Sequence, residues 1–117
     1  MALKIKTRNP QLLLESIKHL IDDGNVCTWS YDNEGDFTHT VDQWKNKAWF
    51  TPYTFENDGV LFFGILGRKD VYMTKEEFSV YHGRFIEMIL SYFITDIDEL
   101  EVISPMRNNF DTKNIDF

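Results

Sequence analysis

The spacing of apolar residues changes twice along the chain, and this change constrains the fold more than any other feature. Residues 10–23 carry an apolar residue every three or four positions, as a helix with one buried face does. Between residues 25 and 68 the spacing falls to two, which is typical of strands. The helical spacing returns at residues 75–95. The sequence therefore predicts an α+β domain in which two helices flank a run of strands.

The first expected helix has a start signal and a stop signal. Asn9 is placed to cap its first turn, and Pro10 suits the first helical position. Gly24 is placed to end the helix in a left-handed conformation. These signals predict a helix over residues 10–23.

The second expected helix begins with the clearest local signal in the chain. Thr74 and Glu77 have the spacing of a capping box, in which each side chain bonds the backbone of the other residue. The pattern predicts a helix over residues 75–95. Its apolar stripe is rich in rings and consists of Phe78, Tyr81, Phe85, Met88, Ile89, Tyr92 and Phe93.

The remaining segments have the composition of strands. Residues 60–67, VLFFGILG, are apolar throughout, which indicates a central strand covered on both faces. Residues 2–8 alternate Leu3 and Ile5 with lysines, as an exposed edge strand does. Further strands are expected over residues 25–31, 37–41 and 47–55, with an optional last strand at 100–104.

The connections between these strands are short, and short connections join antiparallel neighbours. The expected order is β-α-β-β-β-β-α with the optional strand at the end. We therefore expect a mainly antiparallel sheet of four to six strands with both helices packed on one face.

The length of 117 residues fits one domain, which we expect over residues 1–104, followed by a flexible tail at 105–117. The first ten residues lack the apolar segment of a signal peptide, and no apolar run reaches the ~18 residues of a membrane span. A cytoplasmic protein without a membrane contact is therefore expected. The single cysteine, Cys27, excludes an internal disulfide and a multi-cysteine zinc site.

The charge of the chain narrows the classes of partner. The formal net charge is −7, which repels phosphate backbones and disfavours binding to nucleic acid. The same charge suits contact with a basic partner, although an acidic composition also serves solubility alone.

Aromatic residues are in excess for a small core. Ten Phe, five Tyr and three Trp are more rings than one small interior usually encloses, so some are expected at the surface. The sheet face opposite the helices would carry part of this excess, and a homodimer would cover it. Trp29 and Trp49 are expected in the core. Trp44, in the polar connection over residues 42–46, is expected at the surface as an anchor for a partner.

The acidic stretch WSYDNEGDFTHT at residues 29–40 suggests either a cation site or a hairpin turn. Asp32, Glu34 and Asp36 have the alternate spacing of a calcium loop. Such a loop needs glycine at its sixth position and glutamate at its twelfth, whereas Gly35 is fourth and Gln43 is twelfth. The composition favours the tight turn and no metal site, and Asp32 and Asp36 stay candidates for contact with a ligand or partner.

The polar residues and the glycine of the second expected helix serve either close packing or a polar pocket. Gly83 inside that helix costs about 1 kcal/mol relative to alanine, which suggests the close approach of a strand, a second subunit or a ligand. If Arg84 reaches the acidic turn, it joins Asp36, His39 and His82 around one site. One histidine would be a general base and Arg84 would hold an anion. No nucleophile motif or phosphate-binding loop accompanies them.

The stretches WSYDNEGDFTH, QWKNKAWF and YHGRFIEMIL resemble, over residues 10–95, a family of small uncharacterised bacterial proteins. The resemblance implies a bacterial source and brings no activity, cofactor or site residue with it. The residues themselves favour a small acidic interaction protein without catalysis or cofactor, either self-associating or of the immunity or inhibitor type. A small-molecule-binding protein or small enzyme, built on the pocket above, is the alternative.

Overall fold

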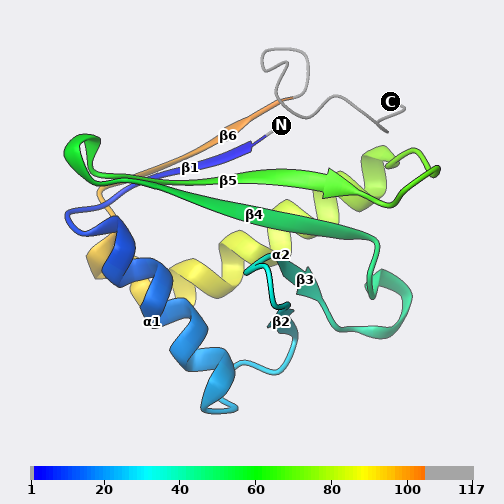
Figure 1. Cartoon of the computed structure of the whole chain (residues 1–117), viewed down its shortest axis with the longest axis horizontal. Helices are drawn as coiled ribbons and strands as arrows, with labels where there is room; N and C mark the ends of the chain where they lie inside the picture. Colours follow the sequence, from blue (N-terminus) through cyan, green and yellow to red (C-terminus); the bar gives the residue numbers. More distant parts are fainter. Residues whose placement is uncertain (1, 105–117) are drawn as a thin grey trace.

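The computed structural model describes residues 2–104 and confirms the α+β class (Figure 1). The helices are α1 (Pro10–Asp22) and α2 (Lys75–Phe93). The strands are β1 (Ala2–Lys6), β2 (Trp29–Tyr31), β3 (Phe37–His39), β4 (Ala48–Phe55), β5 (Val60–Gly67) and β6 (Glu99–Ile103). Short 3₁₀ turns lie at η1 (Asp42–Trp44), η2 (Glu56–Asp58) and η3 (Ile94–Asp96). The tail predicted at 105–117 lies outside the described residues.

The six strands form one sheet in the order β2-β3-β4-β5-β1-β6, and every neighbouring pair is antiparallel. β4 and β5 have eight residues each and pair along their whole length. The optional last strand is present as β6, and β5 has the predicted central position between β4 and β1.

The prediction that the first strand lies at an edge is wrong, because β1 is bonded to β5 on one side and to β6 on the other. Leu3 and Ile5 are fully buried, whereas Lys6 pairs with Glu99 of β6 at 3.4 Å on the opposite face. Alternation of apolar and charged residues shows that one face of a strand is exposed to solvent. It does not show whether the edges of that strand are hydrogen-bonded.

Both helices lie on the same face of the sheet, below β4 and β5 in Figure 1, and we call this the inner face. The inner face contributes a set of fully buried residues to the core, namely Leu3, Ile5, Phe50, Leu61, Phe63 and Ile65. The helices contribute Leu13, Leu14, Ile17, Tyr81, Phe85, Met88 and Ile89 to the same core. The opposite side, the outer face, is covered by neither helix.

The ends of α1 follow the predicted signals. The Asn9 side chain accepts a hydrogen bond from the Leu12 N–H at 3.1 Å, and Gly24 has a φ of +80° just after the helix. The N–H groups of Asn25 and Val26 then bond to the Leu20 carbonyl at 3.1 Å. These two residues therefore complete the helix end instead of pairing in the sheet, which delays β2 from the predicted residue 25 to residue 29.

The capping box of α2 is complete and carries a third partner. The Glu77 N–H donates to the Thr74 hydroxyl at 3.1 Å, and the Thr74 N–H donates to the Glu77 carboxylate at 3.0 Å. The second carboxylate oxygen of Glu77 accepts from the Arg68 guanidinium at 3.0 Å. Glu77 thus ties the connection after β5 to the start of the helix.

Replacing Thr74 by alanine is expected to lower the free energy of unfolding by about 1 kcal/mol, because the helix loses its side-chain cap. Thr74→Ser keeps the hydroxyl and should stay near the parent value. Urea unfolding followed by circular dichroism measures both. An equal loss in the two variants would show that the methyl group, and not the cap, provides the stabilisation.

Candidate functional site

The acidic stretch between β2 and β3 forms the predicted hairpin turn. One carboxylate oxygen of Asp32 accepts from the N–H groups of Glu34 and Asp36, each at 3.0 Å. Gly35 has a φ of +83°, and its N–H donates to the Asp32 carbonyl at 3.0 Å. Among residues 2–104, no three histidine, cysteine, aspartate or glutamate side chains are grouped so as to hold a metal ion. The stretch is explained by the turn that it makes.

Asp36 lies at the end of this turn, beside Thr51 of β4. Burial raises the pKa of its carboxyl group, and the negative charge of Asp32 raises it further. Asp36 therefore stands at the border between the turn and the outer face of β4.

His39 is enclosed in the aromatic core. Its ring stacks on Trp29 with a centroid distance of 4.7 Å and an interplanar angle of 9°. Its Nδ1 donates to the Thr28 carbonyl at 2.6 Å. Burial lowers the pKa of His39, the Thr28 bond opposes this, and the positive charge of Arg84 lowers it further. The neutral ring is therefore part of the packing between β3 and α2.

His82 of α2 is buried in the same way. Its Nδ1 donates to the Phe78 carbonyl at 2.9 Å, and its ring lies 4.1 Å from the Phe78 ring and 5.0 Å from the Phe50 ring, between centroids. Burial lowers the pKa of His82 to about 4, against a raising effect of the Phe78 bond. Only 4% of the residue is exposed, so solvent hardly reaches it.

The structure places the four residues of the predicted polar pocket in different surroundings. His39 and His82 each bond a backbone carbonyl, and each Nε2 is buried without a hydrogen-bond partner in the described part of the chain. Arg84 is exposed, and its charge acts on His39. Gly83 is exposed too, and a Cβ there would meet nothing within 4 Å. No described strand approaches Gly83, so the strand version of the predicted close approach is wrong, whereas the versions with a second subunit or a ligand stay predictions.

Trp44 is half-buried against the core, in contrast to the expected surface anchor. Its backbone carbonyl accepts the hydroxyl proton of Tyr81, and the same hydroxyl accepts from the Lys47 N–H at 3.0 Å. Tyr81 is fully buried and comes from α2. The connection between β3 and β4 is therefore fastened to the helix by one tyrosine.

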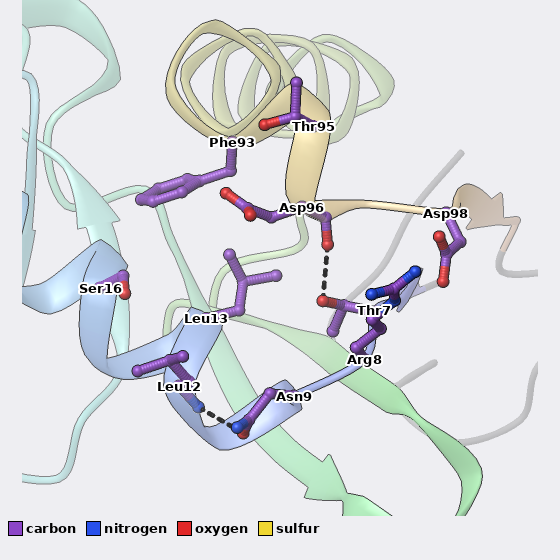
Figure 2. A pocket seen from close by; sticks show the side chains of 10 residues that line it. All are labelled: Thr7, Arg8, Asn9, Leu12, Leu13, Ser16, Phe93, Thr95, Asp96 and Asp98. Atoms are coloured by element: carbon purple, nitrogen blue, oxygen red, sulfur yellow. Dashed lines mark hydrogen bonds between the residues drawn. The ribbon is translucent and has the colours of Figure 1, made fainter.

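A cleft of about 390 Å³ lies between the start of α1 and the end of α2. Figure 2 shows Asp96 pointing toward Phe93 and Leu13, with Arg8 beside Asp98 on the far side. The volume is at the lower end of the range for small-ligand sites, which runs from about 300 to 1,000 Å³.

Some polar groups of this cleft already form hydrogen bonds within the chain, and the charged side chains at its rim carry opposite charges. The first N–H groups of α1 are already bonded, because Gln11 donates to Glu56 at 2.8 Å and Leu12 donates to Asn9. The helix start is thus occupied by an internal carboxylate and does not offer an anion site. One guanidinium and two carboxylates at the rim specify no single ligand charge.

The outer face of β4 and β5 carries exposed apolar residues, and neither helix covers it. Its exposed members are Tyr53, Phe55 and Leu66, with exposed fractions of 42%, 48% and 43%. The half-buried members are Trp49 and Phe62, and the Tyr53 and Phe62 rings lie 6.2 Å apart across the two strands. Two adjacent strands therefore present a stripe of large apolar side chains on one face, which the Thr51–Gly64 pair interrupts.

The stripe lies on the face opposite the helices, where surplus rings are predicted. Trp49 belongs to the stripe, in contrast to its predicted place in the core. Alternation shows which residues share a face of a strand, but both faces of this hairpin carry rings. The signal in the sequence is the phase of Trp49 with Tyr53 and Phe55, which follow it by four and six residues.

Searches of family models, of curated proteins and of solved structures each returned no match for the chain. Among residues 2–104, no helix has the length and apolar character needed to cross a membrane. The function is therefore inferred from the surfaces of residues 2–104.

Proposed function

We propose that this chain is a non-catalytic binding protein that docks a protein partner on the outer face of β4 and β5. The observation that carries the proposal is the stripe of rings on that face, defined by Trp49, Tyr53, Phe55, Phe62 and Leu66. Contiguous apolar patches on soluble proteins are small, and the larger ones commonly mark interaction sites.

The composition of the stripe supports a protein partner. Aromatic side chains are enriched at protein interfaces, where they give a large contact area for little loss of conformational entropy. Tyr53, Phe55 and Leu66 each keep almost half of their surface exposed, and covering that half is worth about 1 kcal/mol for each residue. The exposed parts of Phe55 and Leu66 therefore represent apolar surface that a partner could still cover.

The surroundings of the titratable core residues also support a binding role over catalysis. A general base must come within hydrogen-bond reach of its substrate. His39 and His82 are 1% and 4% exposed, and both are surrounded by rings. A catalytic role would require the aromatic core to open.

A photo-crosslinking side chain placed at Phe55 and expressed in the native cells tests the docking surface. We expect a discrete crosslinked species, because residue 55 would lie against the partner. Tyr72 is the matched control: it is an exposed aromatic residue, 64% accessible, that precedes α2 and lies outside the stripe. The same crosslinker at Tyr72 should give no discrete species.

Mass spectrometry of the crosslinked species identifies the occupant of the face. A crosslink to another protein or to a second copy supports the proposal. Absence of any species at position 55, the same pattern at both positions, or a crosslink only to residues 105–117 of the same chain would overturn it.

A further inference from the structure

We infer that the cleft between the start of α1 and the end of α2 binds a primary alkylammonium group, the chemistry of a lysine side chain or of a free aliphatic amine. The inference goes beyond the proposed function, because the cleft shares no residue with the stripe on the outer face. It is carried by a carboxylate that points into an apolar cleft, by the charges of the two helix ends beside it, and by a hydroxyl on the wall formed by α1.

The charges at this cleft have opposite signs, but they occupy different places. In Figure 2 the Asp96 carboxylate points toward Phe93 and Leu13, which form the apolar part of the cleft. Arg8 lies beside Asp98 on the far side, where the two charges offset each other. The apolar part of the cleft therefore contains one negative charge, and a ligand that enters it should be positive.

Backbone contacts hold the segment that carries Asp96 and leave its carboxylate for a ligand. The Asp96 carbonyl accepts from the buried Thr7 hydroxyl at 2.7 Å, and the Asp98 N–H donates to the Lys6 carbonyl at 2.8 Å. These bonds fasten the segment after α2 to the end of β1. Within residues 2–104, no hydrogen bond or ion pair uses the Asp96 carboxylate.

The two helix ends at the cleft also favour a cation. The C-terminal end of a helix carries a partial negative charge, which a basic residue in the last turn compensates. The last turn of α2 has no basic residue, and its final residue, Phe93, lines the cleft. The start of α1 carries the opposite partial charge, but the Glu56 carboxylate already accepts from the Gln11 N–H there at 2.8 Å. Only the negative helix end therefore lacks a compensating charge in the described chain.

Ser16 provides an additional acceptor on the wall formed by α1. Both serines of α2, Ser79 and Ser91, donate to the carbonyl four residues earlier. Among the described residues, no hydrogen bond engages the Ser16 hydroxyl, and Ser16 lines the cleft (Figure 2). An ammonium group has three donors and no acceptor, so it bonds a carboxylate and a hydroxyl at the same time.

The apolar walls suit an aliphatic chain. Leu12 and Leu13 of α1 and the half-buried Phe93 of α2 line the cleft. Leu12 is 56% exposed, so methylene groups lying on it remove apolar surface from water. The Phe93 ring adds to the attraction, because a cation is drawn to the face of an aromatic ring. An ammonium on an alkyl chain matches both parts of the cleft, whereas an inorganic cation leaves the walls uncovered.

Titration of the purified full-length chain with n-pentylamine tests the inference. The amine is protonated at pH 7, since a primary alkylamine resembles lysine, with an ordinary pKa of about 10.4. We expect saturable amide NMR shifts at Ser16, Phe93 and Asp96, with a dissociation constant on the order of 1 mM for so small a ligand. Pentanoate at the same ionic strength has the same chain and the opposite charge, and should give no saturable shift there. Equal binding of the two would overturn the inference.

Asp96→Asn isolates the carboxylate and keeps the backbone bond to Thr7. The dissociation constant should rise at least about tenfold, because the charge-assisted hydrogen bond is lost. Glu34→Gln makes the same change in net charge on the hairpin turn and should leave the dissociation constant unchanged. An unchanged constant in Asp96→Asn, or equal effects of the two variants, would show attraction to the net charge of −7 and overturn the site.

Ser16→Leu separates the cleft from general electrostatic attraction. The variant keeps every charge, and leucine is a better helix former than serine, so the chain should fold. The larger side chain fills the cleft, and the dissociation constant should rise at least about tenfold. An unchanged constant would place the amine outside the cleft and overturn the inference.

A blocked Gly-Lys-Gly peptide distinguishes the two sources of the ammonium group. Tighter binding of the peptide than of n-pentylamine would identify a lysine side chain as the ligand, and weaker binding would identify a free amine. Both results support the site. The same peptide with acetylated lysine lacks the charge, and equal binding of it would overturn the inference. None of these results depends on the crosslink at residue 55, so the docking surface on the outer face is tested separately.

Discussion

Replacing Phe85 by alanine is expected to lower the free energy of unfolding by about 3–5 kcal/mol. Phe85 is fully buried at the centre of the aromatic core. Its ring stacks on Phe50 at 4.6 Å and meets the rings of Trp29 and Phe63 edge-on at 4.8 and 5.0 Å. The substitution therefore leaves a cavity walled by rigid rings from three strands, which cannot collapse to fill it. Guanidinium unfolding monitored by tryptophan fluorescence measures the loss.

The matched control is Phe55→Ala, which removes the same ring from the outer face. Phe55 is 48% exposed and is not enclosed by the core, so its loss should change the unfolding free energy of the monomer by about 0.5–1 kcal/mol. The measurement is made at low protein concentration, so that self-association does not contribute to the unfolding free energy. Equal losses for the two variants would contradict the assignment of Phe85 to the centre of the core.

Acidification from pH 6.5 to pH 4 is expected to cost about 3 kcal/mol of stability through His82 alone. The pKa of His82 falls from its ordinary value of 6.5 to about 4 in the folded chain, because burial penalises the charged ring. The unfolded chain therefore takes up the proton first. The contribution is complete above pH 6.5, declines as the pH falls, and reaches its limit below pH 4, at 1.36 kcal/mol for each unit of pKa shift. Urea unfolding at a series of pH values measures it.

His82→Leu is the variant that isolates this contribution. Leucine has no proton to gain, so the stability of the variant should fall less steeply between pH 6.5 and 4. His39 has a lowered pKa and acts in the same direction, whereas the raised pKa of Asp36 acts in the opposite one. His39 and Asp36 both remain in the variant. The difference between the stability curves of the parent and the variant therefore gives the contribution of His82. Parallel curves would show that the ring is accessible to solvent in the folded chain.

The helices were predictable from the sequence because their signals are local. Asn9 with Pro10 and the pair Thr74 with Glu77 satisfy backbone groups within one turn, and the structure forms these caps as expected. The hairpin turn after Asp32 has the same character, since its hydrogen bonds join residues at most four apart.

The strand ends and the sheet order were less predictable, because they depend on partners distant in the chain. Residues 25–28 alternate like a strand, yet the carbonyl left free at the end of α1 captures two of their N–H groups. The position of β1 between β5 and β6 depends on residues about 60 and 100 positions away. A sequence pattern with a period of two carries no information about either.

Part of the candidate site was likewise predictable from the sequence, and part depended on the packing of distant segments. Surplus rings could be counted from the composition, and their place on the face opposite the helices followed from the expected packing of both helices on one side. The histidines could not be placed, since alternation within β3 and the stripe of α2 do not show how strand and helix approach each other. In the fold, Trp29 stacks on His39, and the Phe78 ring lies against His82.

The sequence by itself determined the two helices, the hairpin turns and the excess of rings, because caps, turns and composition act over a few residues. Only the tertiary structure decided which histidines lost contact with water, where β1 lies in the sheet, and which face of β4 and β5 the two helices cover. Those outcomes depend on which surfaces meet when distant segments pack. The free energy of packing comes from contacts between two elements, so the sequence of one element alone does not determine it.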